Sequence, residues 1–452
     1  MSGISTIILA AGTGAEMKSE KPKASHKICG KCMLDWVYSQ AEKIGSDKII
    51  TVIGDESQKA CQNKLYAYQK EQLGTGHAVK TALSELPADG GVLVVLCGDT
   101  PLITAETLSY AIEYHVNSRN AATVISAHSP YPYGYGRIIR NETGKVCGII
   151  EENDATPEQK LIDEINSGLY CFDAALLREV IQDLDTNNSA NKFHLTDTLS
   201  LLLENGYTVD AYTVPSYEEI VGINNFFELS LAEKIMRRRI NKKHMLAGVR
   251  IIDPSSTYIS DGCIIGTDTV ILPGSIIEEG TEIGKNCVIG PNANISDCKI
   301  GDSTVINAST ATQSTIGSGV NMGPYAYVRP QCNIADNVKV GDFVEVKNSN
   351  IDEGTKIAHL TYVGDSDVGK KVNFGCGTVT VNYDSSKKHR TTIGDNAFIG
   401  CNTNLVAPVT VGDGAYTAAG STITDDVPGD SLAIARCRQT VKENWRKGKF
   451  NK

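Results

Sequence analysis

A six-residue interval between apolar residues in the second half of the chain constrains the fold more than any other feature. Isoleucines stand six residues apart from Ile265 to Ile295, and the same interval links apolar residues from Ile316 to Val346 and from Ile393 to Val411. An α-helix repeats every 3.6 residues, so this interval cannot keep one helical face buried. A multiple of three residues fits a three-sided coil of short parallel strands whose apolar side chains stack inward. We therefore predict a parallel β-helix for residues 249–452.

Glycines and short irregular segments punctuate this repeat. Gly266, Gly284 and Gly290 each follow an inward position, and we expect these glycines at the tight corners of the coil. The interval shortens to five residues at 295–300, 346–351 and 363–368, where we expect slips of register. The segment "VNYDSSKKHRT" breaks the repeat, and we expect it to project as a loop. By itself, however, the interval fits a β-solenoid without catalytic activity equally well.

The first half of the chain alternates short aliphatic runs with polar, helix-compatible segments. The runs are "STIILAAG", "KIITVIG" and "GVLVVLCGD". This alternation predicts an α/β domain with a largely parallel sheet over residues 1–227. Residues 224–246 lack Pro and Gly and carry apolar residues at three- and four-residue intervals, which predicts a helix, and we assign 228–248 as the linker. Its basic run at 234–243 is either a solvated face or a contact for a partner or phosphate.

Composition excludes several classes of protein. The net charge of −10 argues against a general nucleic-acid surface, and no apolar stretch approaches the ~20 residues of a membrane span. Thirteen scattered cysteines suggest neither a disulfide framework nor a zinc site. Reduced thiols and the absence of a signal-peptide pattern favour a cytoplasmic protein without membrane insertion.

Ten short motifs occur in order along both halves. They are "LAAGTG…PK", "EQLGTGHA", "GDTPLI", "GYGRI", "EINSGLY", "GINN", "YVRP", "VEVKNS", "AHLTYVGD" and "VNYD". With these motifs the whole chain resembles the bifunctional N-acetylglucosamine-1-phosphate uridylyltransferase and glucosamine-1-phosphate N-acetyltransferase family of bacterial cell-wall precursor synthesis. The resemblance implies an α/β, Rossmann-like nucleotidyltransferase domain, a left-handed parallel β-helix of hexapeptide repeats that carries the acetyltransferase, and a homotrimer.

For the first domain, the resemblance implies uridylyl transfer from UTP to a sugar 1-phosphate, with release of pyrophosphate. This chemistry chiefly needs positioning and neutralisation of charge. We expect the backbone N–H groups of Ala10, Ala11 and Gly12 in the glycine turn to face the phosphates and Lys23 to act as the catalytic cation. Asp99 and Asn224 match ligands of Mg²⁺, which prefers oxygen donors. The other positions implied to bind nucleotide or sugar are Leu9, Ala10, Ala11, Gly12, Gln69, Gly74, Thr75, Gly98, Gly136, Glu151 and Asn166.

Two positions in the glycine turn depart from the family pattern. Where the family has threonine and arginine, this chain has Ala15 and Glu16. At ~5 Å and an effective dielectric of about 20, one charge pair is worth roughly 3 kcal/mol, so the sign reversal changes the balance by about twice that. Lys18 and Lys21 would offset part of this loss, or Glu16 would turn into solvent. Uridylyl transfer is therefore either retained or impaired.

For the second domain, the resemblance implies transfer of an acetyl group from acetyl-CoA to the amine of glucosamine 1-phosphate. An ammonium group has no lone pair, so the reaction needs a base, and histidine titrates in the right range. His359 matches that base, and Glu345 matches the carboxylate that holds its other ring nitrogen. The positions implied to bind the sugar phosphate are Arg329, Lys347, Tyr362 and Asn373. Those implied to meet the coenzyme are Cys376, Asn382, Tyr383, Cys401, Ala419 and Arg436.

Three hypotheses follow. The chain is a bifunctional enzyme that uses UTP, sugar 1-phosphates and acetyl-CoA; or it is an acetyltransferase whose first domain has lost turnover; or it is a non-catalytic regulatory or scaffolding subunit. The combination of His359, Glu345, Asn382 and Lys347 argues against the third hypothesis.

Overall fold

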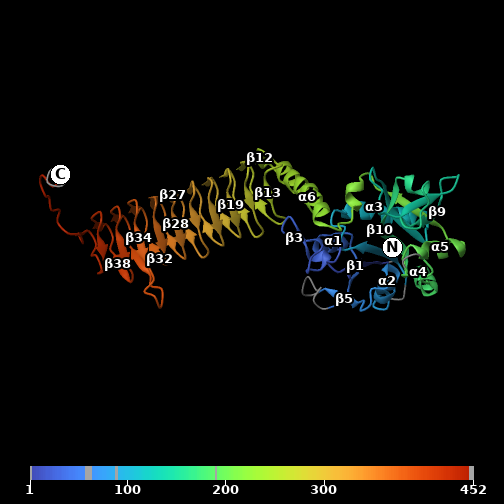
Figure 1. Cartoon of the computed structure of the whole chain (residues 1–452). Coiled ribbons are helices and arrows are strands. Elements are labelled where there is room, and N and C mark those ends of the chain that lie inside the picture. The colour runs from blue at the N-terminus through green and yellow to red at the C-terminus, as the bar shows by residue number, and fades with distance from the viewer. Residues whose placement is uncertain (1–2, 56–63, 87–89, 189–190, 447–452) are drawn as a thin grey trace. The chain divides into compact units, whose positions relative to one another are not determined.

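The computed structural model describes residues 3–55, 64–86, 90–188 and 191–446 (Figure 1). The chain divides into two compact units, Met1–Met236 and Arg237–Lys452. The division falls inside helix α6 (Phe226–Leu246), which spans the segment for which the sequence predicts a helix. No helix among the described residues has the length and apolar character needed to cross a membrane.

The first unit contains a mixed β-sheet in the order β11-β7-β10-β6-β1-β4-β5. Strands β1, β4, β5 and β6 run parallel, as do β7 and β11, whereas β10 is antiparallel to β6 and β7. The prediction of a largely parallel sheet therefore holds for β1, β4, β5 and β6 and for β7 and β11, whereas β10 and the β8–β9 pair form antiparallel contacts. The strands are β1 (Ile4–Leu9), β4 (Lys48–Ile53), β5 (Leu65–Tyr68), β6 (Val92–Cys97), β7 (Ala122–His128), β8 (Arg137–Arg140), β9 (Val146–Ile150), β10 (Glu164–Asp173) and β11 (Val209–Thr213), besides the small hairpin β2 (Lys27–Ile28) and β3 (Lys31–Cys32).

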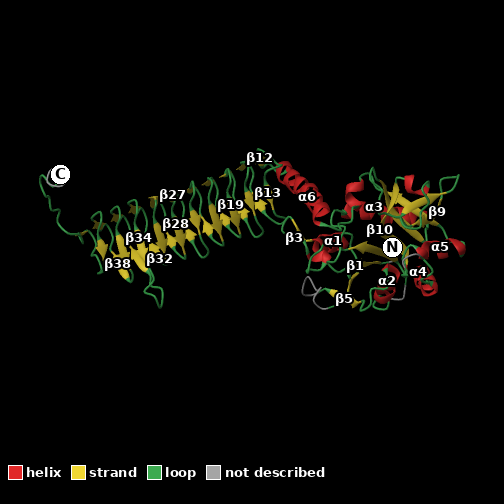
Figure 2. Cartoon of the chain, in the orientation of Figure 1, coloured by secondary structure: helices red, strands yellow, loops and turns green. Residues whose placement is uncertain are grey.

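Helices cover both faces of this sheet (Figure 2). Alternate residues of each aliphatic run point to opposite faces, so that Ile7 joins one buried cluster and Ile8 the other. Helices α2, α4 and α5 contribute to the Ile7 cluster, and α1 and α3 to the Ile8 cluster. This is the doubly covered arrangement that continuous aliphatic strands require. The helices are α1 (Met33–Lys43), α2 (Thr75–Leu83), α3 (Ala105–Ser118), α4 (Ala174–Val180) and α5 (Asp197–Glu204).

The described residues of the second unit form three parallel sheets, in which each strand pairs with the strand one coil later. Ile271, for example, pairs with Ile289. All members of the three apolar runs are at least nine-tenths buried, which confirms that they stack inward. Together with the hexapeptide spacing, these sheets make the unit a left-handed parallel β-helix.

The strands of the three sheets are short, and turns join them at every corner (Figure 2). The first sheet contains β12 (Arg250–Ile251), β15 (Val270–Ile271), β18 (Val288–Ile289), β21 (Val305–Ile306), β24 (Asn321–Met322), β27 (Lys339–Asp342), β30 (Lys356–His359), β33 (Asn373–Phe374), β36 (Phe398–Ile399), β39 (Tyr416–Thr417) and β41 (Leu432–Ala433). The second contains β13 (Tyr258–Ile259), β16 (Ile276–Ile277), β19 (Asn294–Ser296), β22 (Thr310–Thr312), β25 (Tyr327–Val328), β28 (Glu345–Lys347), β31 (Tyr362–Gly364), β34 (Val379–Val381), β37 (Asn404–Val406) and β40 (Thr422–Ile423). The third contains β14 (Ile264–Ile265), β17 (Glu282–Ile283), β20 (Lys299–Ile300), β23 (Thr315–Ile316), β26 (Asn333–Ile334), β29 (Asn350–Ile351), β32 (Ser366–Val368), β35 (Thr391–Ile393) and β38 (Val409–Val411).

The structure corrects the expectation that glycines form the tight corners of the coil. Left-handed backbone at the corners is supplied mainly by non-glycine residues such as Asn286 and Asn337, with φ near +60°. Gly266 is required for a different reason, because a Cβ atom there would lie 2.7 Å from the carbonyl carbon of Gly284 in the next coil. Gly266 and Gly284 therefore permit close packing of successive coils, whereas Gly290, with φ +101°, has the backbone conformation that the expectation requires.

The interruption at 381–391 is a loop, as predicted. It leaves the coil after β34 and returns at β35, and a bridge between Tyr383 and Lys388 closes it. Asp384 accepts hydrogen bonds from the amides of Ser386 and Lys387, which fixes the turn.

Candidate functional site

The glycine turn of the first unit lies at the carboxyl edge of the sheet, where α/β proteins bind ligands. Leu9 at the end of β1 pairs with Cys97 at the end of β6, and the Gly98 amide donates to the Leu9 carbonyl at 2.8 Å. The Ala10 amide donates to the Val52 carbonyl at 2.8 Å and so extends the ladder to β4. The prediction that the Ala10 N–H group faces a phosphate is therefore wrong, whereas the predictions for Ala11 and Gly12 stay predictions.

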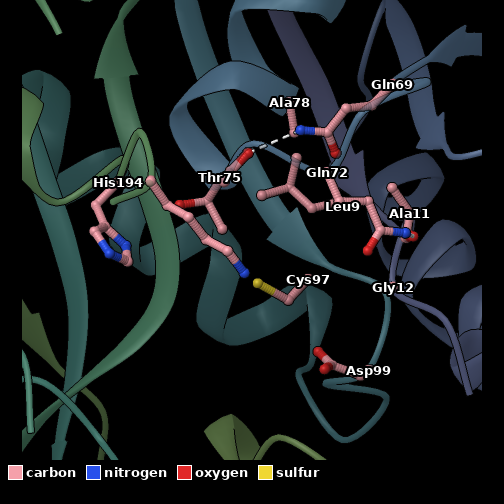
Figure 3. Close-up of a pocket in the computed structure, with 12 residues that line it drawn as sticks. Leu9, Ala11, Gly12, Gln69, Gln72, Thr75, Ala78, Cys97, Asp99 and His194 are labelled. Atoms are coloured by element: carbon pink, nitrogen blue, oxygen red, sulfur yellow. Dashed lines mark hydrogen bonds between the residues drawn. The ribbon is translucent and has the colours of Figure 1, made fainter. Parts of the chain in front are cut away.

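Two adjoining cavities, of about 350 and 430 Å³, open at this edge. Figure 3 shows the first of them, with Leu9, Ala11, Thr75 and Asp99 around it. The second continues along the glycine turn to Glu16 and Lys23 and includes Ala10 and Ala15. The structure thus brings together most of the predicted nucleotide positions. Those in the first cavity are Leu9, Ala11, Gly12, Gln69, Gly74, Thr75 and Asp99.

The far wall of the first cavity is built by the turn that begins α2. The Gln69 side chain donates from Nε2 to the Gly74 carbonyl at 2.9 Å, and Thr75 Oγ1 accepts from the Leu195 amide at 3.0 Å. Gly74 has φ +118°, and a Cβ atom there would lie 2.3 Å from the Phe193 carbonyl oxygen, so only glycine fits. Gln72, which the sequence analysis missed, donates to the Ala11 carbonyl at 2.6 Å and ties this turn to the glycine turn.

Lys23 contacts three polar side chains at the second cavity. Its Nζ atom lies 2.6 Å from Asp99 Oδ2, 2.6 Å from Asn224 Oδ1 and 3.1 Å from Glu16 Oε2. Burial lowers the pKa of Lys23, but the Asp99 and Glu16 carboxylates outweigh that effect and raise the pKa above its ordinary value. The lysine therefore stays charged.

The predicted metal ligands converge on the same point. Asp99 Oδ2 and Asn224 Oδ1 both contact one ammonium group, so their oxygens face a single position already suited to a cation. A carboxylate and an amide oxygen fit a hard divalent cation that completes its shell with water and phosphate. In the described part of the chain, the position at Asp99 and Asn224 included, no group of three His, Cys, Asp or Glu side chains is arranged to hold a metal.

Glu16 occupies the mouth of the second cavity. Its side chain is 67% exposed, yet it pairs with Lys23. It has therefore not turned away into solvent. Lys18 and Lys21 are not among the residues that line the two cavities, so the expected compensation from these two lysines is absent from the lining. Lys192, from the segment before α5, lines both cavities.

The three predicted sugar positions of the first unit also lie together. Gly136 accepts from the Asn166 amide at 2.8 Å, and a Cβ atom on Gly136 would lie 3.4 Å from Glu151 Oε2. The Asn166 side chain is held by Tyr170, whose hydroxyl lies 2.9 Å from Asn166 Nδ2. Thr196 donates to Glu151 at 3.1 Å and fixes that carboxylate.

In the second unit, His359 is held by Asp342. The Nδ1 atom lies 2.7 Å from Asp342 Oδ1, and because a carboxylate accepts, Nδ1 carries the proton and Nε2 of the neutral ring is left as an acceptor. The hydrogen bond from His359 lowers the pKa of Asp342. The prediction that Glu345 holds the imidazole is wrong, because Asp342 lies opposite His359 in the ladder of β27 and β30, whereas Glu345 lies opposite Tyr362.

Glu345 instead lies in a cationic group of side chains that contains Arg329, Lys347 and Lys388. Arg329 donates from Nη1 to Glu345 Oε1 at 2.8 Å. The neighbouring Lys388, from the projecting loop, together with burial, lowers the pKa of Lys347. Tyr362 is linked to this group through Asn382, whose Nδ2 lies 3.3 Å from the tyrosine hydroxyl and 2.5 Å from Asp365. Arg329, Lys347 and Lys388 therefore give this surface a positive charge.

Four predicted positions follow one another along the coil. The amide after Cys401 donates to the Cys376 carbonyl at 2.8 Å, and the amide after Ala419 donates to the Cys401 carbonyl at 2.8 Å. These three residues thus occupy equivalent places in successive coils, and Arg436 Cδ lies 3.8 Å from the Cβ position of Gly420 at their end. Such a line of small side chains suits an extended ligand. Tyr383 is exposed on the projecting loop at 381–391. Asn373 lies in β33 of the first sheet, where it pairs with Lys356.

The cysteines require a second correction. Cys29 and Cys32 form a C-x-x-C pair that the sequence analysis overlooked. Both lie in the β2–β3 hairpin, and burial and Asp35 raise the pKa of Cys32. A raised pKa disfavours the reactive thiolate form of Cys32. Cys61 lies outside the described residues.

Comparisons with known proteins agree with both halves. Residues 6–186 match the model of the MobA-like NTP transferase domain, and residues 390–425 match the bacterial transferase hexapeptide model. The chain is 51% identical to the bifunctional protein GlmU of Geobacillus sp. (strain WCH70), over 97% of this chain and 96% of that protein. It is 51% identical to that of Thermoanaerobacter pseudethanolicus (100% and 99% covered) and 49% identical to that of Clostridioides difficile (99% and 98%). With half of its residues shared along the full length of these relatives, the chain belongs to the GlmU family.

Proposed function

We propose that this chain carries out two successive transfers: acetylation of glucosamine 1-phosphate with acetyl-CoA in the β-helix, then uridylyl transfer from UTP to N-acetylglucosamine 1-phosphate in the α/β unit. The observation that carries the proposal is that one chain, similar throughout to proteins named bifunctional, has both a cation-lined nucleotide cavity and an oriented histidine base.

In the acetyl transfer, His359 Nε2 removes a proton from the substrate ammonium group. The amine nitrogen then attacks the thioester carbonyl carbon, the C–N bond forms and the C–S bond breaks. The nitrogen loses its second proton as the amide forms, and the leaving thiolate of coenzyme A takes up that proton. Asp342 keeps the proton of the imidazole on Nδ1, so that Nε2 is free to accept. Arg329 and Lys347 supply the cations for the sugar phosphate, and acetyl-CoA extends along Cys376, Cys401, Ala419 and Arg436.

In the uridylyl transfer, a phosphate oxygen of the sugar 1-phosphate attacks the α-phosphorus of UTP, and the bond to pyrophosphate breaks. Ala11 and Gly12 donate backbone hydrogen bonds, and Lys23 neutralises charge on the phosphates. We assign Mg²⁺ to Asp99 and Asn224, where the ion would neutralise phosphate charge when bound. Gly136, Glu151 and Asn166 position the sugar.

A second candidate function follows from the Glu16–Lys23 ion pair. A carboxylate at 3.1 Å competes with the phosphates for the catalytic cation. On this alternative the chain acetylates its sugar substrate at a normal rate and transfers uridylyl groups slowly. The intact set of His359, Asp342 and Lys347 argues against a non-catalytic scaffold in either case.

We also propose a homotrimer in the cytoplasm. Tyr325, Phe343 and Leu360 are more than half exposed and occupy one corner of successive coils, and the rings of Tyr325 and Phe343 stack at 5.5 Å. Phe343 and Leu360 directly follow Asp342 and His359, so this apolar ridge borders the acetyl-transfer site. A second copy of the chain is the occupant we propose for it. Light scattering should give the mass of a trimer, and Phe343→Asp should lower that mass.

The two half-reactions test the proposal separately. Thiol release from acetyl-CoA is followed after adding glucosamine 1-phosphate, and pyrophosphate release after adding UTP, N-acetylglucosamine 1-phosphate and Mg²⁺. His359→Ala should abolish only the first and Lys23→Ala only the second. Loss of both activities in either variant would indicate misfolding, and unchanged activity in both variants would refute the assigned roles.

A further inference from the structure

We propose that Lys192 binds the phosphates of the nucleotide and supplies the positive charge that the glycine turn of this chain lacks. The inference rests on the proposed uridylyl transfer and adds a residue that the sequence motifs do not include. Lys192 lies more than 160 positions after the glycine turn and lines both of the cavities that this turn borders.

The charges around the two cavities include too little positive charge to neutralise a bound triphosphate without such a cation. Their described lining contains two lysines, Lys23 and Lys192. Lys23 is paired with both Asp99 and Glu16, so one ammonium group already faces two carboxylates. A nucleoside triphosphate would add further negative charge to the same space. Lys192 forms no ion pair among the described residues and is exposed, so its charge is available to a ligand.

The backbone next to Lys192 is fixed to the nucleotide cavity. The Phe193 amide donates to the Leu73 carbonyl at 2.8 Å, and the Gly76 amide donates to the Phe193 carbonyl at 2.9 Å. The Leu195 amide then donates to Thr75 Oγ1 at 3.0 Å. These contacts attach residues 193–195 to the turn that begins α2, and that turn itself lines the first cavity. Lys192 therefore projects from an anchored segment rather than from a free loop.

The position of Lys192 also complements that of Glu16. Both residues line the second cavity, and each contributes one charge to it. A lysine acts on phosphate as a point charge on a flexible stem and does not need the planar geometry of an arginine. The cation required for the triphosphate thus comes from the 191–195 segment in this chain, while the glycine turn contributes Glu16.

The test compares Lys192→Ala, Lys192→Arg and the control Lys145→Ala in the full-length protein. Lys145 is an exposed lysine in the β8–β9 turn and lines neither cavity. Lys192→Ala should raise the KM for UTP at least tenfold and weaken UTP binding in calorimetry by a similar factor. It should weaken binding of uridine, which has no phosphate, less than twofold. Lys192→Arg should restore most of the affinity, and Lys145→Ala should match the parent protein.

Acetyl transfer in the same samples reports whether each variant is folded. If the parent protein binds UTP and releases pyrophosphate but Lys192→Ala does so equally well, the role of Lys192 is refuted while the proposed function stands. If Lys192→Ala weakens uridine as strongly as UTP, the residue shapes the cavity and does not bind phosphate. If the parent protein neither binds UTP nor releases pyrophosphate, the proposed uridylyl transfer fails and this inference fails with it.

Discussion

His359 Nδ1 lies 2.7 Å from Asp342 Oδ1, and the two residues face each other across adjacent coils of the β-helix. Seventeen positions separate them, one fewer than the usual eighteen of a coil, because the interval shortens to five residues at 346–351. The slip of register brings a carboxylate to the histidine that the sequence identifies as the base. The shortened coil therefore determines which side chain orients the imidazole.

Asp342→Asn should lower kcat of acetyl transfer about 10- to 100-fold. An amide side chain can donate to Nδ1 and so permits the wrong tautomer, in which Nε2 carries the proton. The KM for glucosamine 1-phosphate should change less than threefold, because Asp342 does not belong to the cationic group. A matching loss in kcat for Asp384→Asn, a carboxylate that contacts the other nearby histidine, His389, would show that the effect is not specific.

Glu345→Gln should act mainly on binding of the sugar phosphate. Glu345 accepts from Arg329 and not from His359, so its replacement releases the guanidinium group and changes KM several-fold. The pH dependence of kcat should keep its shape. Steady-state kinetics over pH 6–9 would check this, and a loss of kcat like that of Asp342→Asn would restore the original assignment of Glu345.

Glu16→Ala should raise kcat/KM of uridylyl transfer by a factor of roughly 3 to 10. Removing the carboxylate frees Lys23 from one of its two anionic partners. The gain is limited because Glu16 is two-thirds exposed and its charge is screened by solvent. Pyrophosphate release at fixed Mg²⁺ measures the effect. Glu20→Ala, an exposed neighbour outside both cavities, serves as the control; an equal gain there would point to general surface charge.

His115→Gln should make the stability of the first unit less sensitive to acid. Burial lowers the pKa of His115 to about 4, from 6.5 in an unfolded chain. The unfolded state therefore binds a proton that the folded state does not, and stability falls as the pH drops from about 6.5 towards 4, by about 3 kcal/mol in total. Above pH 6.5 this contribution to stability is fully present.

Urea unfolding at pH 7 and pH 5 would measure this difference. Glutamine can keep a hydrogen bond to Thr123, which lies 2.9 Å from His115 Nδ1. The variant should lose less stability between the two pH values than the parent protein does. His128→Gln, at an exposed histidine, should leave the pH dependence of the parent intact. Equal pH dependence in the parent and His115→Gln would refute the prediction.

Gly341→Ala should destabilise the β-helix by about 2 kcal/mol or more and reduce acetyl transfer. A Cβ atom there would lie 1.8 Å from the carbonyl oxygen of Ala358, which is backbone and cannot rotate away. Pushing the two coils apart would also displace Asp342 from His359. Thermal unfolding and the thiol-release assay would check both effects. Gly222→Ala, where no atom lies within 4 Å of the new Cβ, should cost little.

The sequence by itself determined both folds and pointed to many of the residues that the structure brings together. The six-residue interval predicted the inward stack from Ile265 to Val411, because a three-sided coil repeats its geometry at every side. The aliphatic runs predicted the layered sheet, and the motifs after β1 and β6 placed Gly12 and Asp99 at its carboxyl edge.

Only the tertiary structure decided which of these residues are partners. Asp342 and not Glu345 meets His359, the Ala10 amide is already bonded to Val52, and Lys192 reaches a cavity built by residues far away in sequence. Each of these contacts joins strands or segments whose relative register depends on the length of every intervening turn. A local pattern fixes the direction of a side chain within its own strand, whereas the neighbour across the next strand is set by how the whole chain packs.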